Sequence, residues 1–200
     1  ARRIGIEIEY PVIYPDFSQF PVQKVFRMMQ DDGWEPVFDD IYDELIGVKQ
    51  NRRVVTTDAG ISLLEINEPP CDNLFQLDKN YQKFFLKLYE LFLSQNGIIL
   101  GYGIQPLSDE IRWVKKGRYE ILRQTLPSAV DNISLSSASQ VHLELRKEEI
   151  VGAVNAFNAL AGIFIALCAN SPIWKGRKAS KLAMRESFYE EFAMNRSGIP

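Results

Sequence analysis

The stretch RIGIEIEY, residues 3–10, decides the fold class, because apolar residues alternate in it with charged or small ones. A period of two is typical of a β-strand with one buried face. The isoleucines at positions 4, 6 and 8 point to one side of that strand, whereas Glu7 and Glu9 point to the other. The sequence therefore predicts a strand that buries an aliphatic face and presents two carboxylates on the opposite face.

Two further predicted strands divide their faces in the same way. Residues 61–67 place Glu65 and Asn67 on one face, and Asp58 lies just before this strand. Residues 138–146 alternate as well, and their polar positions are Gln140, His142 and Glu144. A half-exposed antiparallel sheet has one polar face in any case. Several acids on one face, however, repel one another unless cations such as magnesium, which prefers carboxylate oxygens, neutralise them.

The remaining segments predict helices and short strands without a regular βαβ rhythm. Residues 45–49 and 53–57 form a hairpin, and residues 98–102 form a short strand. Predicted helices cover residues 21–32, 73–96, 118–125, 148–169 and 182–192. The helix over residues 148–169 is mostly apolar, so we expect it to be largely buried. The pattern predicts one α+β domain over residues 1–200, with a largely antiparallel sheet and helices packed on one face.

Composition excludes several classes of protein. The chain is 46% hydrophobic and 24% charged, which is an ordinary globular balance. Its net charge of −3, without a basic run, argues against a nucleic-acid partner. The longest apolar stretch, residues 159–169, is shorter than the roughly 20 residues that a bilayer span requires. We therefore expect a cytoplasmic protein without a membrane partner, and leave a homo-oligomer open.

Neither the cysteines nor any glycine-rich loop points to a familiar catalytic device. Cys71 and Cys168 are best interpreted as reduced thiols, although a bridge between them stays open. The chain has no P-loop or dinucleotide-binding motif, so metals and basic side chains would have to hold any nucleotide.

Several segments, in order along the chain, resemble the glutamate–cysteine ligases, whose catalytic domain is similar to that of glutamine synthetase. Residues 5–9 resemble the opening Gly-x-Glu-x-Glu strand of the family, and residues 57–70 resemble its next metal-binding strand. Residues 136–144 and 169–198 resemble the "Ala-Ser-x-Gln-Val" and "Ala-Asn-Ser-Pro … Ser-x-Arg … Arg-Thr-Gly" segments of its plant and proteobacterial branch. Each motif is weak alone, whereas the ordered set is specific.

The resemblance implies an ATP- and Mg2+-dependent ligase. The γ-carboxylate of L-glutamate would be phosphorylated by ATP and then joined to the amine of L-cysteine, giving γ-glutamylcysteine, the first intermediate of glutathione synthesis. Another amine acceptor, a non-catalytic glutamate- or nucleotide-binding relative, and a domain whose acids merely face solvent are the alternatives. Because the family's catalytic domain continues well beyond the position of Pro200, we expect these 200 residues to be an incomplete domain.

The resemblance also assigns roles to individual residues. The implied metal ligands are Glu7, Glu9, Asp58 and Glu65. Gln140 and His142 would lie beside the metals or the nucleotide phosphates. Related families have a metal-binding histidine at the position of Gln140, so metal ligation by Gln140 or by His142 stays open. Arg185 and Arg196 would hold carboxylate or phosphate groups, because a guanidinium binds either in a bidentate manner.

Overall fold

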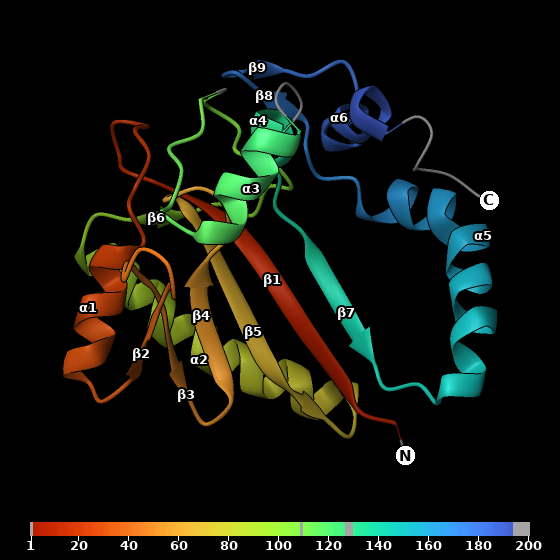
Figure 1. The fold of residues 1–200 in the computed structure, drawn as a ribbon, viewed down its shortest axis with the longest axis horizontal. Helices are drawn as coiled ribbons and strands as arrows, with labels where there is room; N and C mark the ends of the chain where they lie inside the picture. Colours follow the sequence, from red (N-terminus) through yellow and green to blue (C-terminus); the bar gives the residue numbers. More distant parts are fainter. Residues whose placement is uncertain (1, 109, 127–129, 194–200) are drawn as a thin grey trace.

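The sheet predicted from the sequence forms the body of the molecule (Figure 1). The structure is a computed structural model that describes residues 2–108, 110–126 and 130–193. Within these residues one sheet has seven strands, in the order β2-β3-β4-β5-β1, with β6 and β7 both pairing with β1. Every pairing is antiparallel. The strands are β1 (Ile4–Ile13), β2 (Glu35–Phe38), β3 (Leu45–Gln50), β4 (Arg53–Thr57), β5 (Leu63–Cys71), β6 (Ile98–Ile99) and β7 (Ser139–Leu143).

One strand boundary differs from the prediction. The strand predicted over residues 61–67 stops before Pro69 and Pro70, yet β5 continues through both prolines to Cys71. The partner β4 pairs with β5 only as far as Asn67, so beyond this point β5 has a neighbour on one side alone. The register with β1 also shifts between Ile4 and Ile6, opposite this segment. Prolines are tolerated at such sheet edges and bulges because the missing N–H is not needed there.

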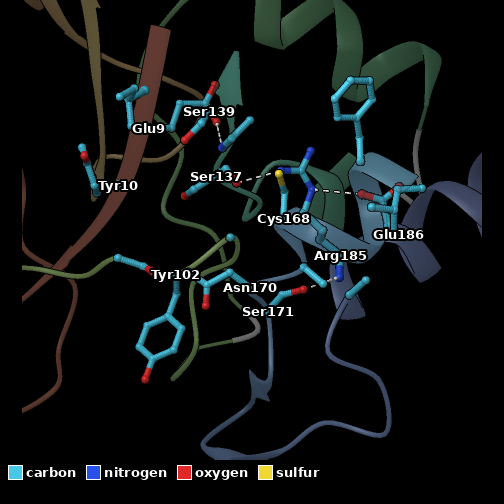
Figure 2. A pocket seen from close by; sticks show the side chains of 18 residues that line it. Glu9, Tyr10, Tyr102, Ser137, Ser139, Cys168, Asn170, Ser171, Arg185 and Glu186 are labelled. Atoms are coloured by element: carbon cyan, nitrogen blue, oxygen red, sulfur yellow. Dashed lines mark hydrogen bonds and ion pairs between the residues drawn. The ribbon is translucent and has the colours of Figure 1, made fainter. Parts of the chain in front are cut away.

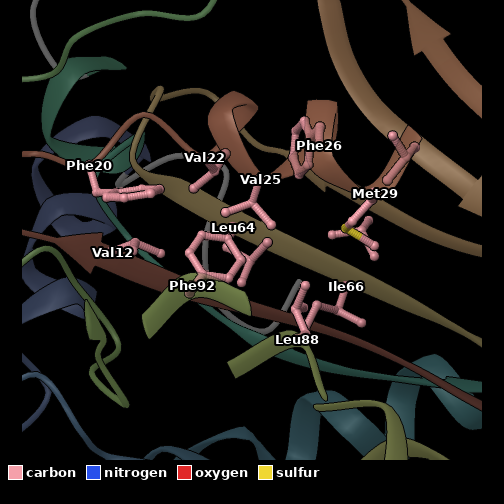
Figure 3. Packing of buried hydrophobic residues seen from close by; sticks show 12 residues of the cluster. Val12, Phe20, Val22, Val25, Phe26, Met29, Leu64, Ile66, Leu88 and Phe92 are labelled. Carbon is pink, nitrogen blue, oxygen red and sulfur yellow. The ribbon is translucent and has the colours of Figure 1, made fainter. Parts of the chain in front are cut away.

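Two helices cover the apolar face of the sheet, as predicted. These are α1 (Gln23–Asp31) and α2 (Leu74–Ser94). The side chain of Asn73 caps α2 by accepting a 2.9 Å hydrogen bond from the amide of Gln76. The main hydrophobic core lies between these helices and the sheet (Figure 3). Its buried members are Val12, Phe20, Val22, Val25, Phe26, Met29, Val48, Val55, Leu64, Ile66, Leu88 and Phe92.

Smaller elements gather beyond one end of the long strands (Figure 1). They are α3 (Gly117–Thr125), α4 (Val130–Ile133), α6 (Met184–Ala193) and the two-stranded ribbon of β8 (Ile173–Trp174) and β9 (Arg177–Lys178). A core cluster of Ile104, Leu135 and Phe188 joins α4, α6 and the ribbon, whereas α3 packs through Tyr119 in another cluster, with Ala59 and Val114. This arrangement brings α3 and α6 close to the ends of the strands that carry the acids.

The long apolar helix α5 (Ile150–Cys168) forms where it was predicted, but the expectation that it is buried was wrong. None of its residues is buried, and it runs beside the sheet without packing on it (Figure 1). With the short 3-10 turn before it (Lys147–Glu149), it spans 22 residues and contains an 18-residue window of mean hydropathy 2.0, which is long and apolar enough to cross a bilayer. A helix that is apolar on all sides requires packing partners, and no residue of α5 is buried against the described part of the chain.

Candidate metal and substrate site

Three carboxylates meet on the polar face of the sheet because of the strand register. Glu9 on β1 pairs directly with Glu65 on β5. Glu7 pairs with Asn67 on β5 and with Gln140 on β7. Residues opposite each other in antiparallel strands share a face. One oxygen from each of Glu7, Glu9 and Glu65 accordingly lies within 4.8 Å of the others.

Neighbouring amides fix two of these carboxylates. Gln140 Nε2 donates a 2.8 Å hydrogen bond to Glu7 Oε1 and a longer one, 3.4 Å, to Glu9 Oε1. The backbone amide of Ala138 donates a 2.7 Å hydrogen bond to the other oxygen of Glu9. Gln140 therefore lies at the acid cluster, where the sequence placed it, and orients its members.

Glu9 and Glu65 bind a proton more tightly than ordinary carboxylates do. Burial, with the nearby charges of Asp58, Glu65 and Glu7, raises the pKa of Glu9 to about 8. Burial and the charges of Glu7 and Asp58 also raise the pKa of Glu65, against the hydrogen bond that it accepts from Asn67. Such mutual repulsion is relieved when a cation binds among the acids. Carboxylate oxygens are also donors that suit magnesium, so these residues fit that ion.

Asp58 lies beside these three acids, although its own carboxylate already has partners. The Tyr119 hydroxyl donates to Asp58 Oδ1, and Arg118 Nη2 lies 3.3 Å from the same oxygen. The charge of Asp58 acts on both Glu9 and Glu65. The predicted ligand is thus close to the cluster, and metal ligation by Asp58 stays a prediction.

No role was predicted for Lys116, which contacts the residue directly before Asp58. Its side chain is nearly inaccessible, with 7% of the residue exposed, and its ammonium donates to the Thr57 carbonyl. Burial, followed by the charge of Arg118, lowers the pKa of Lys116 to about 8. The available signal was the group of cations Lys115, Lys116 and Arg118 next to Tyr119, at the start of the helix predicted over residues 118–125.

Two cavities adjoin the acid cluster, and Glu9 and Arg185 line both. The first, of about 420 Å³, lies between β1, residues 101–103 and the C-terminal end of α5 (Figure 2). The second, of about 570 Å³, is also lined by Asp58 and Tyr119. The Arg185 guanidinium is held by a 2.8 Å hydrogen bond from Nη1 to the Ser137 carbonyl. Arg185 is therefore placed to reach a ligand in either cavity.

The remaining predicted residues divide into three groups. His142 pairs with Gly5, two positions along the strand from the Gln140–Glu7 pair, so it lies on the polar face without joining the cluster of three acids. Arg196 lies outside the described residues. Cys71 and Cys168 are both free thiols, as the preferred interpretation of the sequence had them.

Comparison with known proteins decides the family. A model of glutamate–cysteine ligase family 2 matches residues 3–200. The chain belongs to this family. The chloroplastic glutamate–cysteine ligase of Nicotiana tabacum is 29% identical to it over 174 residues, and that of Arabidopsis thaliana is 27% identical over 173 residues. Each alignment covers 83% of this chain and 33% of the relative, so this ligase-family chain spans about a third of the length of these relatives.

A solved structure was also matched. It is a glutamate–cysteine ligase from Francisella tularensis in complex with AMP, 17% identical, with a TM-score of 0.48. The match covers 90% of this chain and 38% of the other.

Proposed function

We propose that this chain carries the cation site and part of the substrate site of an ATP-dependent glutamate–cysteine ligase. The observation that supports this most strongly is the convergence of Glu7, Glu9 and Glu65 in a member of that family. Phosphoryl transfer requires charge neutralisation and in-line positioning more than covalent chemistry from the protein. A carboxylate cluster is suited to that task.

In this proposal the γ-phosphoryl group of ATP passes to the γ-carboxylate of L-glutamate, and ADP leaves. The amine of L-cysteine then attacks the acyl carbon. A C–N bond forms, the amine loses a proton, and inorganic phosphate leaves. The product is γ-glutamylcysteine.

The residues of the site have distinct parts in this reaction. Glu7, Glu9 and Glu65 would hold magnesium ions, which when bound neutralise the charge of the transferring phosphoryl group. Gln140 keeps the Glu7 carboxylate in its orientation. Arg185 borders both cavities and would bind a substrate carboxylate or a phosphate. The buried hydroxyl of Ser137 has no hydrogen-bond partner among the described residues and lines the first cavity, where a polar ligand would satisfy it.

The decisive assay is phosphate release from ATP and L-glutamate by the complete protein. L-Cysteine should stimulate release more than L-alanine or ammonia, and γ-glutamylcysteine should accumulate. Glu65→Gln should abolish turnover without loss of folding, because it removes a charge from the site and no core contact. Glu90→Gln, at an exposed acid on α2, which covers the opposite face of the sheet, is the matched control and should retain activity. Equal stimulation by all three amines would favour a different carboxylate–amine ligase.

A further inference from the structure

The environment of Lys116 is unusual for a lysine. The residue is 7% exposed, and no carboxylate of the described residues lies within ion-pair distance of its ammonium. Lysines are almost never fully buried without such a partner. Its ammonium donates a hydrogen bond to a backbone oxygen, the carbonyl of Thr57, and lies 5.7 Å from the centroid of the Tyr119 ring. Thr57 is the last residue of β4 and directly precedes Asp58.

Residues 114–119, the segment that contains Lys116, also contact the turn of residues 57–59 at other points. The Tyr119 hydroxyl and Arg118 both contact Asp58 Oδ1. The amide of Val114 donates a 2.9 Å hydrogen bond to the carbonyl of Ala59, the residue after Asp58. Lys116 adds the contact on the N-terminal side. The turn is therefore clamped before, at and after Asp58 by residues 114–119.

We propose that Lys116 is a positioning residue of the cation site, which holds the Thr57–Asp58 turn against Glu9 and Glu65. This inference rests on the proposed function, because the cations are those of the proposed ligase. Lys116 does not reach the reacting groups; it acts through the backbone of Thr57. Outer-shell residues of this kind typically alter metal affinity by about 10- to 100-fold.

The direction in which cation affinity changes when Lys116 is replaced distinguishes a positioning role from a purely electrostatic one. Removal of a buried positive charge beside an acid cluster should by itself strengthen cation binding. Loss of the anchor should instead let the turn move, and the cation should bind more weakly. We therefore expect Lys116→Met to weaken Mn2+ binding by about tenfold or more, although it removes a repelling charge.

The test is Mn2+ binding to the complete protein, measured by the electron paramagnetic resonance signal of the free ion at a temperature well below the thermal midpoint. Lys115→Met is the matched control, since it deletes the same charge from the exposed neighbouring residue. It should leave Mn2+ affinity close to that of the wild type. Lys116→Gln loses the charge but keeps a donor one atom shorter, so it should bind Mn2+ more weakly than the wild type and more tightly than Lys116→Met.

Each outcome decides between the alternatives. Unchanged or tighter Mn2+ binding by Lys116→Met, even with a lowered thermal midpoint, would overturn the inference and leave a purely structural lysine. If Lys116→Met does not fold, Lys116→Gln serves instead: weaker Mn2+ binding than the wild type supports the inference, and unchanged or tighter binding overturns it. If the wild-type protein itself binds no Mn2+, the proposed cation site fails, which is a separate result from the failure of Lys116.

Discussion

At the scale of single residues, the most consequential pair outside the site is Arg53 with Glu68. Two hydrogen bonds of 2.7 and 2.6 Å join them, and the Glu68 side chain is only 1% exposed. The guanidinium also stacks 4.1 Å above the Phe84 ring. Removing one partner of a buried ion pair leaves an uncompensated charge, at a cost of about 3–5 kcal/mol.

Arg53→Ala should therefore lower the free energy of unfolding, measured in urea, by that amount. The control is Arg27→Ala, at an exposed position on α1, which should change it by no more than about 0.5 kcal/mol. Similar losses in the two variants would show that the pair contributes nothing specific.

The titration of Glu9 gives the metal-free protein a distinct dependence on pH. Its pKa rises from an ordinary 4.5 to about 8 on folding, so the folded state holds the proton more tightly than the unfolded state. The resulting stability is fully present below about pH 4.5 and is lost as pH rises through about 8. The thermal midpoint in a chelator should thus fall between about pH 4.5 and 8, and Glu9→Gln should flatten this fall. An equally steep decline in Glu9→Gln would refute the assignment.

At the scale of elements, the Asn73 cap isolates one contribution to α2. Asn73 has extended backbone and accepts from the Gln76 amide, so its side chain satisfies a helix N–H that otherwise lacks a partner. Asn73→Ala should cost about 1 kcal/mol of stability, and Asn73→Asp, which can still accept that bond, should restore most of it. Chemical denaturation of the three proteins measures the difference. Equal stability of the Ala and Asp variants would show that the Asn73 cap does not stabilise α2.

Elements with clear periodicity could be predicted from the sequence, and those fixed by distant contacts could not. The isoleucines of β1 and the capped, amphipathic α2 specify their own structure. By contrast, β2 was missed because Glu35–Phe38 is only four residues long and contains a proline. The length of β5 depends on where β4 stops pairing, which no local pattern records.

The candidate site likewise has features that could be predicted from the sequence and features that could not. The shared face of Glu7, Glu9 and Glu65 follows from a period of two along each strand and from the pairing of β1 with β5. The Tyr119 hydroxyl, in the first turn of α3, contacts Asp58, which lies 61 positions earlier in the chain. No local pattern in the sequence records this contact, which only the folded structure shows.

At the scale of the whole molecule, α5 is the feature that local rules describe least well. Both ends of α5 contact the domain that contains the seven-stranded sheet. Glu149 just before it forms an ion pair with Arg2, and the amide of Gly103 donates a 2.6 Å hydrogen bond to the carbonyl of Asn170 just after it. The helix cannot cross a bilayer while it keeps these contacts, because a spanning helix carries its ends to opposite sides of the membrane.

Exposed apolar surface on this scale drives proteins to associate. We expect the 200-residue chain to self-associate in solution with increasing concentration, as light scattering after size exclusion would show. A triple replacement by lysine at Val151, Ile163 and Leu167, which are 70%, 57% and 77% exposed, should restore the monomer. Because these side chains bury little, the thermal midpoint should barely change.

The matched control places three lysines at apolar residues that are similarly exposed but scattered over the rest of the surface. These positions are Phe17, Leu86 and Leu182, which are 68%, 62% and 67% exposed. Scattered apolar residues are normal on soluble proteins and offer no continuous contact area. This variant should therefore associate as the wild type does. A wild-type chain that stays monomeric at high concentration, or a control variant that becomes monomeric as readily as the α5 variant, would show that α5 does not mediate the association.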